Sequence, residues 1–265
     1  MVVGALGIAA GSASGTTLYS QDFEANTDGW FDYGGTLTRV PTSTGGITSA
    51  GGGYHAVVTG AYTAWGGYNF GAGSVPTTFQ PYRTALDIYL DTTLTAPDDS
   101  RFDYSSAISD SDGQHRRDFV MTGGFYVDGQ TQETSFIFSA SNNTPGWPKN
   151  PNSDPYQIAT SGWYTIEHTY YDNGGVLAVD MSIGVSGGAT LHTWTLSNAS
   201  DDISLIGGNR YGWMLNIDSD LGGLAIDNTE MATLGQAAVP EPLTLTALLA
   251  GLGGLGAYLR RRAAA

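Results

Sequence analysis

Apolar and polar residues alternate along much of the chain, most clearly in Tyr82–Leu90. Leu86, Ile88 and Leu90 share one face of that stretch, and Asp87 lies on the other. A period of two residues is the pattern of a half-buried β-strand. Further segments with strand character are Leu18–Glu24, Thr36–Val40, Tyr54–Val58, Arg101–Ile108, Asp118–Val127, Glu133–Ser139, Trp163–Tyr171, Val176–Val185, Thr190–Leu196, Tyr211–Ile217 and Leu224–Asp227.

Turn sequences join these segments, and no amphipathic helix interrupts them. Asp172–Gly175 and Ser186–Gly188 are typical hairpin turns. Asn142–Pro155 carries four prolines, so we expect a surface loop there. About a dozen strands without helices predict an all-β fold, an antiparallel β-sandwich. No internal boundary or repeat is visible, so the sandwich is expected over residues 16–232, with a linker over 233–239.

The C-terminus has a different pattern, in three consecutive parts. Pro240, Glu241 and Pro242 follow Val239, an uncharged apolar run covers 243–259, and three basic residues come next. A helix of about 17 residues is roughly 25 Å long, the short limit for crossing a bilayer. Basic flanks stay in the cytoplasm, so the body of the chain would lie outside. The three basic residues are Arg260, Arg261 and Arg262.

This tail, residues 240–265, resembles the PEP-CTERM sorting signal of Gram-negative bacteria in motif, spacing and position. The resemblance implies recognition and processing by an exosortase, a membrane protease-transpeptidase. It also implies membrane anchoring by a single transmembrane helix, 243–259, before processing, and then delivery to the cell surface or the extracellular matrix. It covers about a tenth of the chain and does not say what the body does. The alternative is a buried C-terminal helix, which the glycines, prolines and arginine triplet suit badly.

The N-terminal residues 1–15 are apolar and small, as in the later part of a secretory signal peptide. Small residues around Ala10 and Ala13 suit cleavage by signal peptidase, although the basic start of such a peptide is missing. We therefore expect these residues to be the remnant of a signal peptide. This expectation agrees with export of the chain.

Composition and charge narrow the possible functions. The sequence has 38 glycines, 15 tyrosines and 6 tryptophans, which favours strands and tight turns. Its net charge is −15, and without Glu241 and the tail arginines 24 acidic and 7 basic residues remain, or −17. Such a surface repels phosphate backbones, so nucleic acid is not an expected partner. The absence of cysteine excludes disulfides and thiolate chemistry.

Three segments of the body resemble sandwiches of the jelly-roll and concanavalin-like type found in lectins and carbohydrate-binding modules. They are Asp22–Trp30, Trp163–Asp180 and Leu224–Glu230. The resemblance implies that the first and last strands lie side by side. It also implies a structural calcium site made by Glu24 and Asp227 with Asn26 or Asp22. The alternative is that these acids face solvent. Asp110 and Asp112 form a weaker calcium candidate, for which an ordinary Asp-Gly turn is the stronger interpretation.

Aromatic residues in loops are the candidates for glycan binding, because sugars stack their C–H faces on aromatic rings. For each of them, packing in the core is the alternative. Trp30, Trp163 and Trp213 lie in hydrophobic strands and are expected in the core. The glycan-binding candidates are Tyr62, Trp65, Tyr68, Trp147 and Tyr156.

Signs of catalysis are weak. The chain has five glutamates, none in the paired arrangement of a retaining glycosidase, and Glu167 and His168 should point to opposite faces of a strand. The motifs of serine hydrolases, metalloproteases and P-loop proteins are absent from the sequence. We therefore expect a non-enzymatic exported protein that binds exopolysaccharide or another glycan. The alternatives are a structural matrix protein without a ligand site and, third, a glycoside hydrolase or lyase.

Overall fold

The computed structural model describes residues 15–65, 77–143, 146 and 148–235. Residues Thr16–Thr233 form one compact unit. The described residues contain fifteen strands and four short 3-10 helices, and all the strand pairings are antiparallel. The predicted all-β antiparallel sandwich is therefore confirmed. No helix in these ranges is long and apolar enough to cross a membrane. The tail and the predicted transmembrane helix 243–259 lie outside the described residues.

Sheet A, one layer of the sandwich, has eight strands. Seven follow one path, and β1 pairs with β15 beside it. The strands in order are β13 (Thr190–Asp202), β12 (Val176–Val185), β11 (Gly162–Asp172), β6 (Tyr82–Leu90), β15 (Leu224–Thr233), β4 (Tyr54–Gly60) and β3 (Gly35–Pro41), with β1 (Thr17–Gln21).

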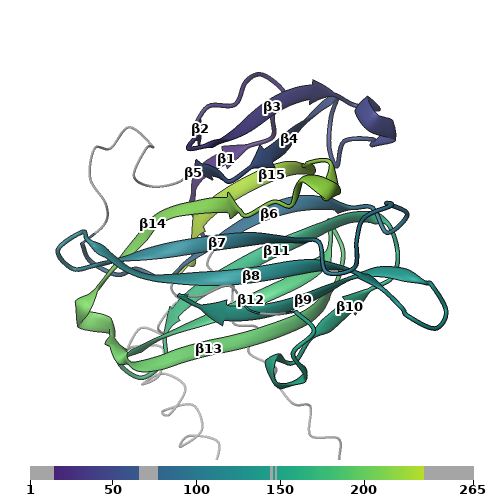
Figure 1. The fold of residues 1–265 in the computed structure, drawn as a ribbon. Coiled ribbons are helices and arrows are strands. Elements are labelled where there is room, and N and C mark those ends of the chain that lie inside the picture. The colour runs from purple at the N-terminus through teal and green to yellow at the C-terminus, as the bar shows by residue number, and fades with distance from the viewer. Residues whose placement is uncertain (1–14, 66–76, 144–145, 147, 236–265) are drawn as a thin grey trace, which may run out of the picture. The chain divides into compact units, whose positions relative to one another are not determined.

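Sheet B, the other layer, has seven strands, and Figure 1 shows β7, β8 and β14 of this sheet side by side. The strands in order are β10 (Tyr156–Ile158), β9 (Thr134–Asn142), β8 (His115–Val127), β7 (Arg101–Asp110), β14 (Ile206–Leu215), β5 (Tyr62–Trp65) and β2 (Trp30–Asp32). The 3-10 helices are η1 (Thr44–Gly46), η2 (Pro151–Ser153), η3 (Ile203–Leu205) and η4 (Ser219–Leu221).

The core between the sheets follows from the alternation along the strands. Leu86 and Ile88 of β6 are fully buried and belong to one cluster with aromatic rings of sheet B. Phe102 of β7 contacts Phe138 of β9 edge to face, with ring centroids 5.9 Å apart. Each large apolar side chain that is fully buried contributes about 1.5 to 3 kcal/mol. The sandwich therefore rests on the period-two pattern visible in the sequence.

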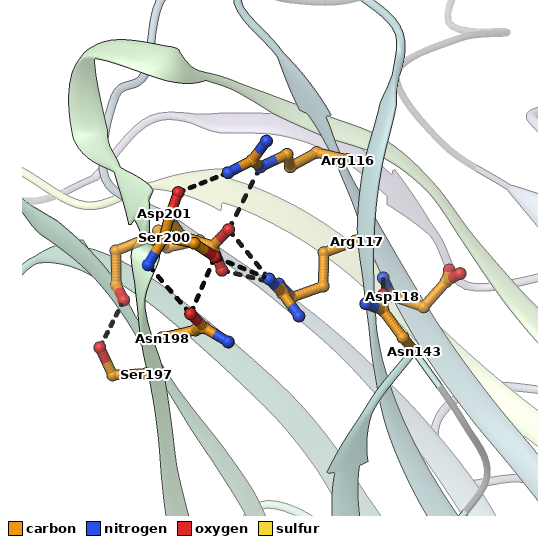
Figure 2. Close-up of polar contacts among 9 residues, drawn as sticks. Arg116, Arg117, Asp118, Asn143, Ser197, Asn198, Ser200 and Asp201 are labelled. Atoms are coloured by element: carbon orange, nitrogen blue, oxygen red, sulfur yellow. Dashed lines mark hydrogen bonds and ion pairs between the residues drawn. The ribbon is translucent and has the colours of Figure 1, made fainter.

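A polar contact joins the two sheets at one edge, between β8 and β13. Figure 2 shows Arg116 and Arg117 of β8 pointing toward Asp201 of β13. The Nε atoms of Arg116 and Arg117 lie 3.2 and 2.7 Å from the Asp201 carboxylate, which is almost fully buried. Removing one partner of such a buried ion pair costs roughly 3 to 5 kcal/mol. Because the Asp201 carboxylate is buried, this contact bridges the two sheets.

Candidate binding cleft

A cleft of about 370 Å³ lies on sheet B, at strands β2, β5 and β14. Four of the six side chains that line it are aromatic, and one is an arginine. The lining contains no carboxylate. The residues are Phe31, Tyr33, Ala64, Arg210, Tyr211 and Trp213.

The strand register explains why these side chains meet. Ala64 of β5 pairs with Phe31 of β2 on one side and with Trp213 of β14 on the other. Directly paired residues point to the same face of a sheet. Neighbouring strands lie about 4.8 Å apart, so the backbones carrying Phe31 and Trp213 are roughly 10 Å apart with a methyl group between them. The result is an aromatic-walled trough with a small residue at its floor.

A β-bulge adds the arginine to the same face. Asn209 of β14 pairs with Ile108 and Tyr211 with Ala107, so Arg210 is the extra residue. In a regular strand Arg210 and Tyr211 would point to opposite faces, but a bulge re-aims one of the two side chains. Both residues accordingly line the cleft. The Arg210 guanidinium lies 5.7 Å from the Tyr211 ring centroid, and its Nη1 donates to the carbonyl of Gly113 at 2.5 Å.

Trp65 lies beneath this surface, which corrects the prediction that it binds glycan. It is fully buried, and its ring stacks on Tyr19 at 5.7 Å between centroids. Trp65 pairs with Gly212, and a Cβ atom at Gly212 would come within 2.7 Å of the Trp65 indole nitrogen. Alternation along β5 turns Ala64 toward the cleft and Trp65 toward the core. Trp65 therefore supports the cleft from inside.

Asp118 of β8 accepts a hydrogen bond from one ring of the cleft lining and contacts His115, which stacks on another. Its Oδ1 accepts hydrogen bonds from the Ser105 hydroxyl at 3.1 Å and from the Trp213 indole at 3.4 Å. Its Oδ2 lies 2.9 Å from Nε2 of His115. The His115 ring stacks on Tyr211 at 6.4 Å, and Tyr211 meets Trp213 edge to face at 4.3 Å. Burial raises the pKa of the Tyr211 hydroxyl, and the nearby Asp118 charge adds to that rise.

Sequence reasoning missed this cleft, because it assigned Trp213 to the core. It assigned Trp163, on the other sheet, to the core as well. Both side chains are half-buried. Trp163 donates its indole N–H to the carbonyl of Thr48, and its ring contacts Tyr89 edge to face. Trp30 is buried as predicted.

Of the remaining glycan-binding candidates, the structure describes the side chain of Tyr156, and this residue does not line the cleft. Tyr156 in β10 is half-buried and stacks on His192 at 5.0 Å, so one face of its ring is covered. The side chain of Tyr62, and the whole of Tyr68 and Trp147, lie outside the described residues. The same holds for the sorting-signal residues at 239–242 and 260–262.

The calcium candidates do not form a cation cage. Glu24 uses one carboxylate oxygen to accept the backbone N–H groups of Gly53 and Tyr54, each at 2.9 Å. Asn26 bonds to Gln21 and Asp28 in its own turn. In the described part of the chain, no group of three or more His, Cys, Asp or Glu residues is placed to hold a metal ion.

Asp227 is the clearest mismatch with calcium. Its Oδ2 faces the N–H groups of Ala50 and Gly51 at 3.0 and 3.3 Å, and its Oδ1 accepts from Asn228 at 2.9 Å. Oxygens that face N–H groups are not turned toward a cation, which needs converging oxygen ligands. Burial raises the pKa of Asp227 to about 6, with a contribution from neighbouring Asp87. The predicted site at Glu24, Asn26 and Asp227 therefore has no support from this geometry.

The weaker calcium candidate is an ordinary turn. Asp110 Oδ1 accepts the backbone N–H groups of Asp112 and Gln114, and Gly113 has a positive φ of 77°. The carboxylate thus closes the turn between β7 and β8.

Glu167 and His168 point to opposite faces of β11, as alternation predicted. His168 is fully buried, and Glu167 forms an ion pair with Arg83 at 3.0 Å. The same Arg83 also binds Glu230 at 2.7 Å, so one guanidinium lies between two carboxylates. A glycosidase needs two carboxylates that face each other across the scissile bond, whereas both of these carboxylates contact one guanidinium. The pair therefore gives no support to the hydrolase alternative.

Comparison with known proteins adds little beyond the fold. No protein-family model and no curated protein matches the chain. The CBM2 module of the Lactobacillus casei BL23 phage J-1 evolved Dit aligns at 12% identity and a TM-score of 0.44, covering 84% of this chain and 98% of that chain. Winged bean acidic lectin, complexed with methyl-alpha-D-galactose, aligns at 11% and 0.38, covering 81% and 99%. Lectin UEA-II, complexed with galactose, aligns at 10% and 0.35, covering 82% and 99%. Likeness this slight says nothing about the ligand of this chain.

Proposed function

We propose that this protein binds glycan, without chemically changing it, in the cleft on sheet B. The observation that carries the proposal is the meeting of Phe31, Tyr33, Tyr211 and Trp213 around a cavity with Arg210 at its side. Aromatic rings offer flat apolar faces to the C–H faces of a sugar, and the guanidinium offers several N–H donors to its hydroxyls.

The alternative of a structural protein without a ligand site fits this surface less well. A protein without a ligand site would be expected to bury its large aromatic rings in the core. Here Phe31, Tyr211 and Trp213 are only half-buried, and Tyr33 beside them is 69% exposed. Exposed aromatic clusters of this kind mark binding surfaces more often than scattered apolar residues do. The cleft therefore favours the binding function.

Export and sorting remain proposals that rest on the sequence. We propose that the tail anchors the chain in the membrane, that an exosortase processes it, and that the product reaches the cell surface or matrix. Exopolysaccharide would then be the glycan within reach. If Pro240 and Pro242 belong to the processing signal, replacing both with alanine should leave a larger, membrane-bound form on immunoblots. Normal processing of that variant would contradict the proposal.

Affinity gel electrophoresis tests the binding function directly. The full chain would run through gels that contain soluble glucans, mannans, galactans or polyuronates. Retardation by at least one polymer is expected, and Trp213→Ala should abolish it. Trp163→Ala is the matched control, since this tryptophan is half-buried on the other sheet. Equal retardation of the two variants, or no retardation of the wild type by any polymer, would contradict the proposal.

A further inference from the structure

The aromatic surface continues past the cleft, onto β8. His115 is the first residue of β8, its side chain is 40% exposed, and its ring is stacked within 17° of the plane of Tyr211. From Phe31 through Trp213 and Tyr211 to His115, rings are carried by strands β2, β14 and β8. The row crosses sheet B obliquely, because Tyr211 lies two residues along β14 from Trp213, and His115 lies three residues along β8 from Asp118, which is level with Tyr211.

The length of this row follows from the strand order. The strands β8, β7, β14, β5 and β2 are consecutive neighbours, which gives four steps of about 4.8 Å, or roughly 19 Å measured perpendicular to the strands. The offset along the strands adds to this length. Small or buried side chains lie between the rings, with Ala64 on β5 and Ala107 on β7. The row is therefore several times longer than one sugar ring.

Exposure along the row is highest at its two ends. Tyr33 stands 69% exposed beside β2, and His115 is the most exposed ring on the β8 side. The middle of the row, Tyr211 and Trp213, is half-buried and fixed by ring contacts and by Asp118. A site for a single terminal sugar would place its rings around one point, whereas these rings follow a line.

We propose that the row takes an internal segment of a linear, uncharged polysaccharide, laid across the strands from β2 to β8 with His115 as the outermost stacking residue. This inference rests on the proposed glycan-binding function. A neutral polymer is favoured because the chain carries a net charge of −15, which repels polyanions over the whole surface. Asp118, beside His115 and Tyr211, adds to that repulsion locally.

Two contacts hold the His115 ring in place. Asp118 Oδ2 lies 2.9 Å from its Nε2, and the ring plane matches that of Tyr211. A histidine ring that is already fixed presents one face for stacking, so little side-chain entropy is lost when the ligand binds. His115 would therefore act only when the ligand is long enough to reach it from Trp213.

A ladder of oligomers tests the inference. The probes are linear gluco- and manno-oligosaccharides of two, four and six residues, with the parent polymers, titrated into the full chain by calorimetry. Affinity should rise about tenfold or more from two to six residues, because added sugars gain further stacking contacts. His115→Ala should remove roughly five- to tenfold of the six-residue affinity and leave the two-residue affinity within a factor of about two. His192→Ala is the matched control on sheet A.

The outcomes separate the two proposals. Dimers that bind as tightly as hexamers, or a His115→Ala variant that weakens all lengths equally, would overturn the extended-chain inference and leave a single-sugar site. Polyuronate binding stronger than that of the neutral polymers would overturn the uncharged ligand. If no oligomer or polymer binds, or if Trp213→Ala binds as the wild type does, the glycan-binding function itself fails.

Discussion

Trp213 donates its indole N–H to Asp118 across strand β7, at 3.4 Å between Nε1 and Oδ1. The two residues lie on β14 and β8, which β7 separates. The same carboxylate lies 2.9 Å from His115. One acid thus fixes an aromatic ring at each side of Tyr211, and the orientation of the row depends on it.

Replacing Asp118 tests this dependence. Asp118→Ala removes the acceptor for both rings and should weaken glycan binding about five- to tenfold, or about 1 to 1.4 kcal/mol, because the two rings are no longer held in place before the ligand binds. Asp118→Asn keeps an oxygen for Trp213 and an N–H₂ group for His115, so it should retain most of the affinity. Calorimetry on the polymer that binds, with melting curves to verify folding, makes the comparison. Equal losses in both variants would contradict the positioning role.

Gly212 is the tightest point beneath the cleft. A Cβ atom there would lie 2.7 Å from Nε1 and 2.8 Å from Cε2 of Trp65, which is inside van der Waals contact. Gly212→Ala should therefore lower the free energy of unfolding by roughly 1 to 3 kcal/mol, the usual cost of overpacking. Gly129→Ala is the control, because nothing lies within 4 Å of its added Cβ. Urea unfolding of both variants tests this, and equal stability would show that Trp65 moves freely.

His168 gives the sandwich an acid-sensitive element in its core. It is fully buried on β11, with its ring edge to face with Tyr104 at 5.4 Å, and burial lowers its pKa to about 3. In the unfolded chain its pKa is about 6.5. Between these values the unfolded state binds a proton and the folded state does not. The contribution of His168 to stability therefore falls as the pH falls from about 6.5 toward 3, and it is constant above 6.5.

The variant His168→Phe isolates this effect. Asp227, whose pKa is raised to about 6, acts with the opposite sign, because the folded state binds its proton more readily between pH 6 and about 3.8. The difference in unfolding free energy between variant and wild type should nevertheless change by up to about 1.4 kcal/mol per pH unit below 6.5, in favour of the variant. Urea unfolding at pH 7.5, 5.5 and 4.5 measures it. Parallel stability profiles would show that His168 takes up a proton in the folded state.

Much of the fold could be predicted from sequence because its cause is local. The bounds of β6 and β12 are those that alternation predicted, and β1 pairs with β15 as the resemblance of the end segments implied. The short strands β5 and β10 were not predicted. Each has only three or four residues, too few to show a period.

The cleft could not be predicted, because its causes are not local. The segment containing Tyr211 and Trp213 is apolar on both faces, with Met214 turned to the core, so its period does not reveal which face is buried. The bulge at Arg210 then breaks the alternation on which a sequence argument depends. The one local sign is Gly212, a glycine between two large aromatics, since a missing side chain indicates a crowded neighbour.

The most direct test of the binding site is the ¹H–¹⁵N spectrum of the tryptophan indoles, recorded while a binding polysaccharide is titrated in. The sequence has six tryptophans, and single substitutions assign their indole signals. Binding in the cleft predicts that the Trp213 indole signal shifts to saturation and that the Trp163 indole signal, from the other sheet, does not shift. A saturating shift at Trp163 with Trp213 unchanged would contradict it.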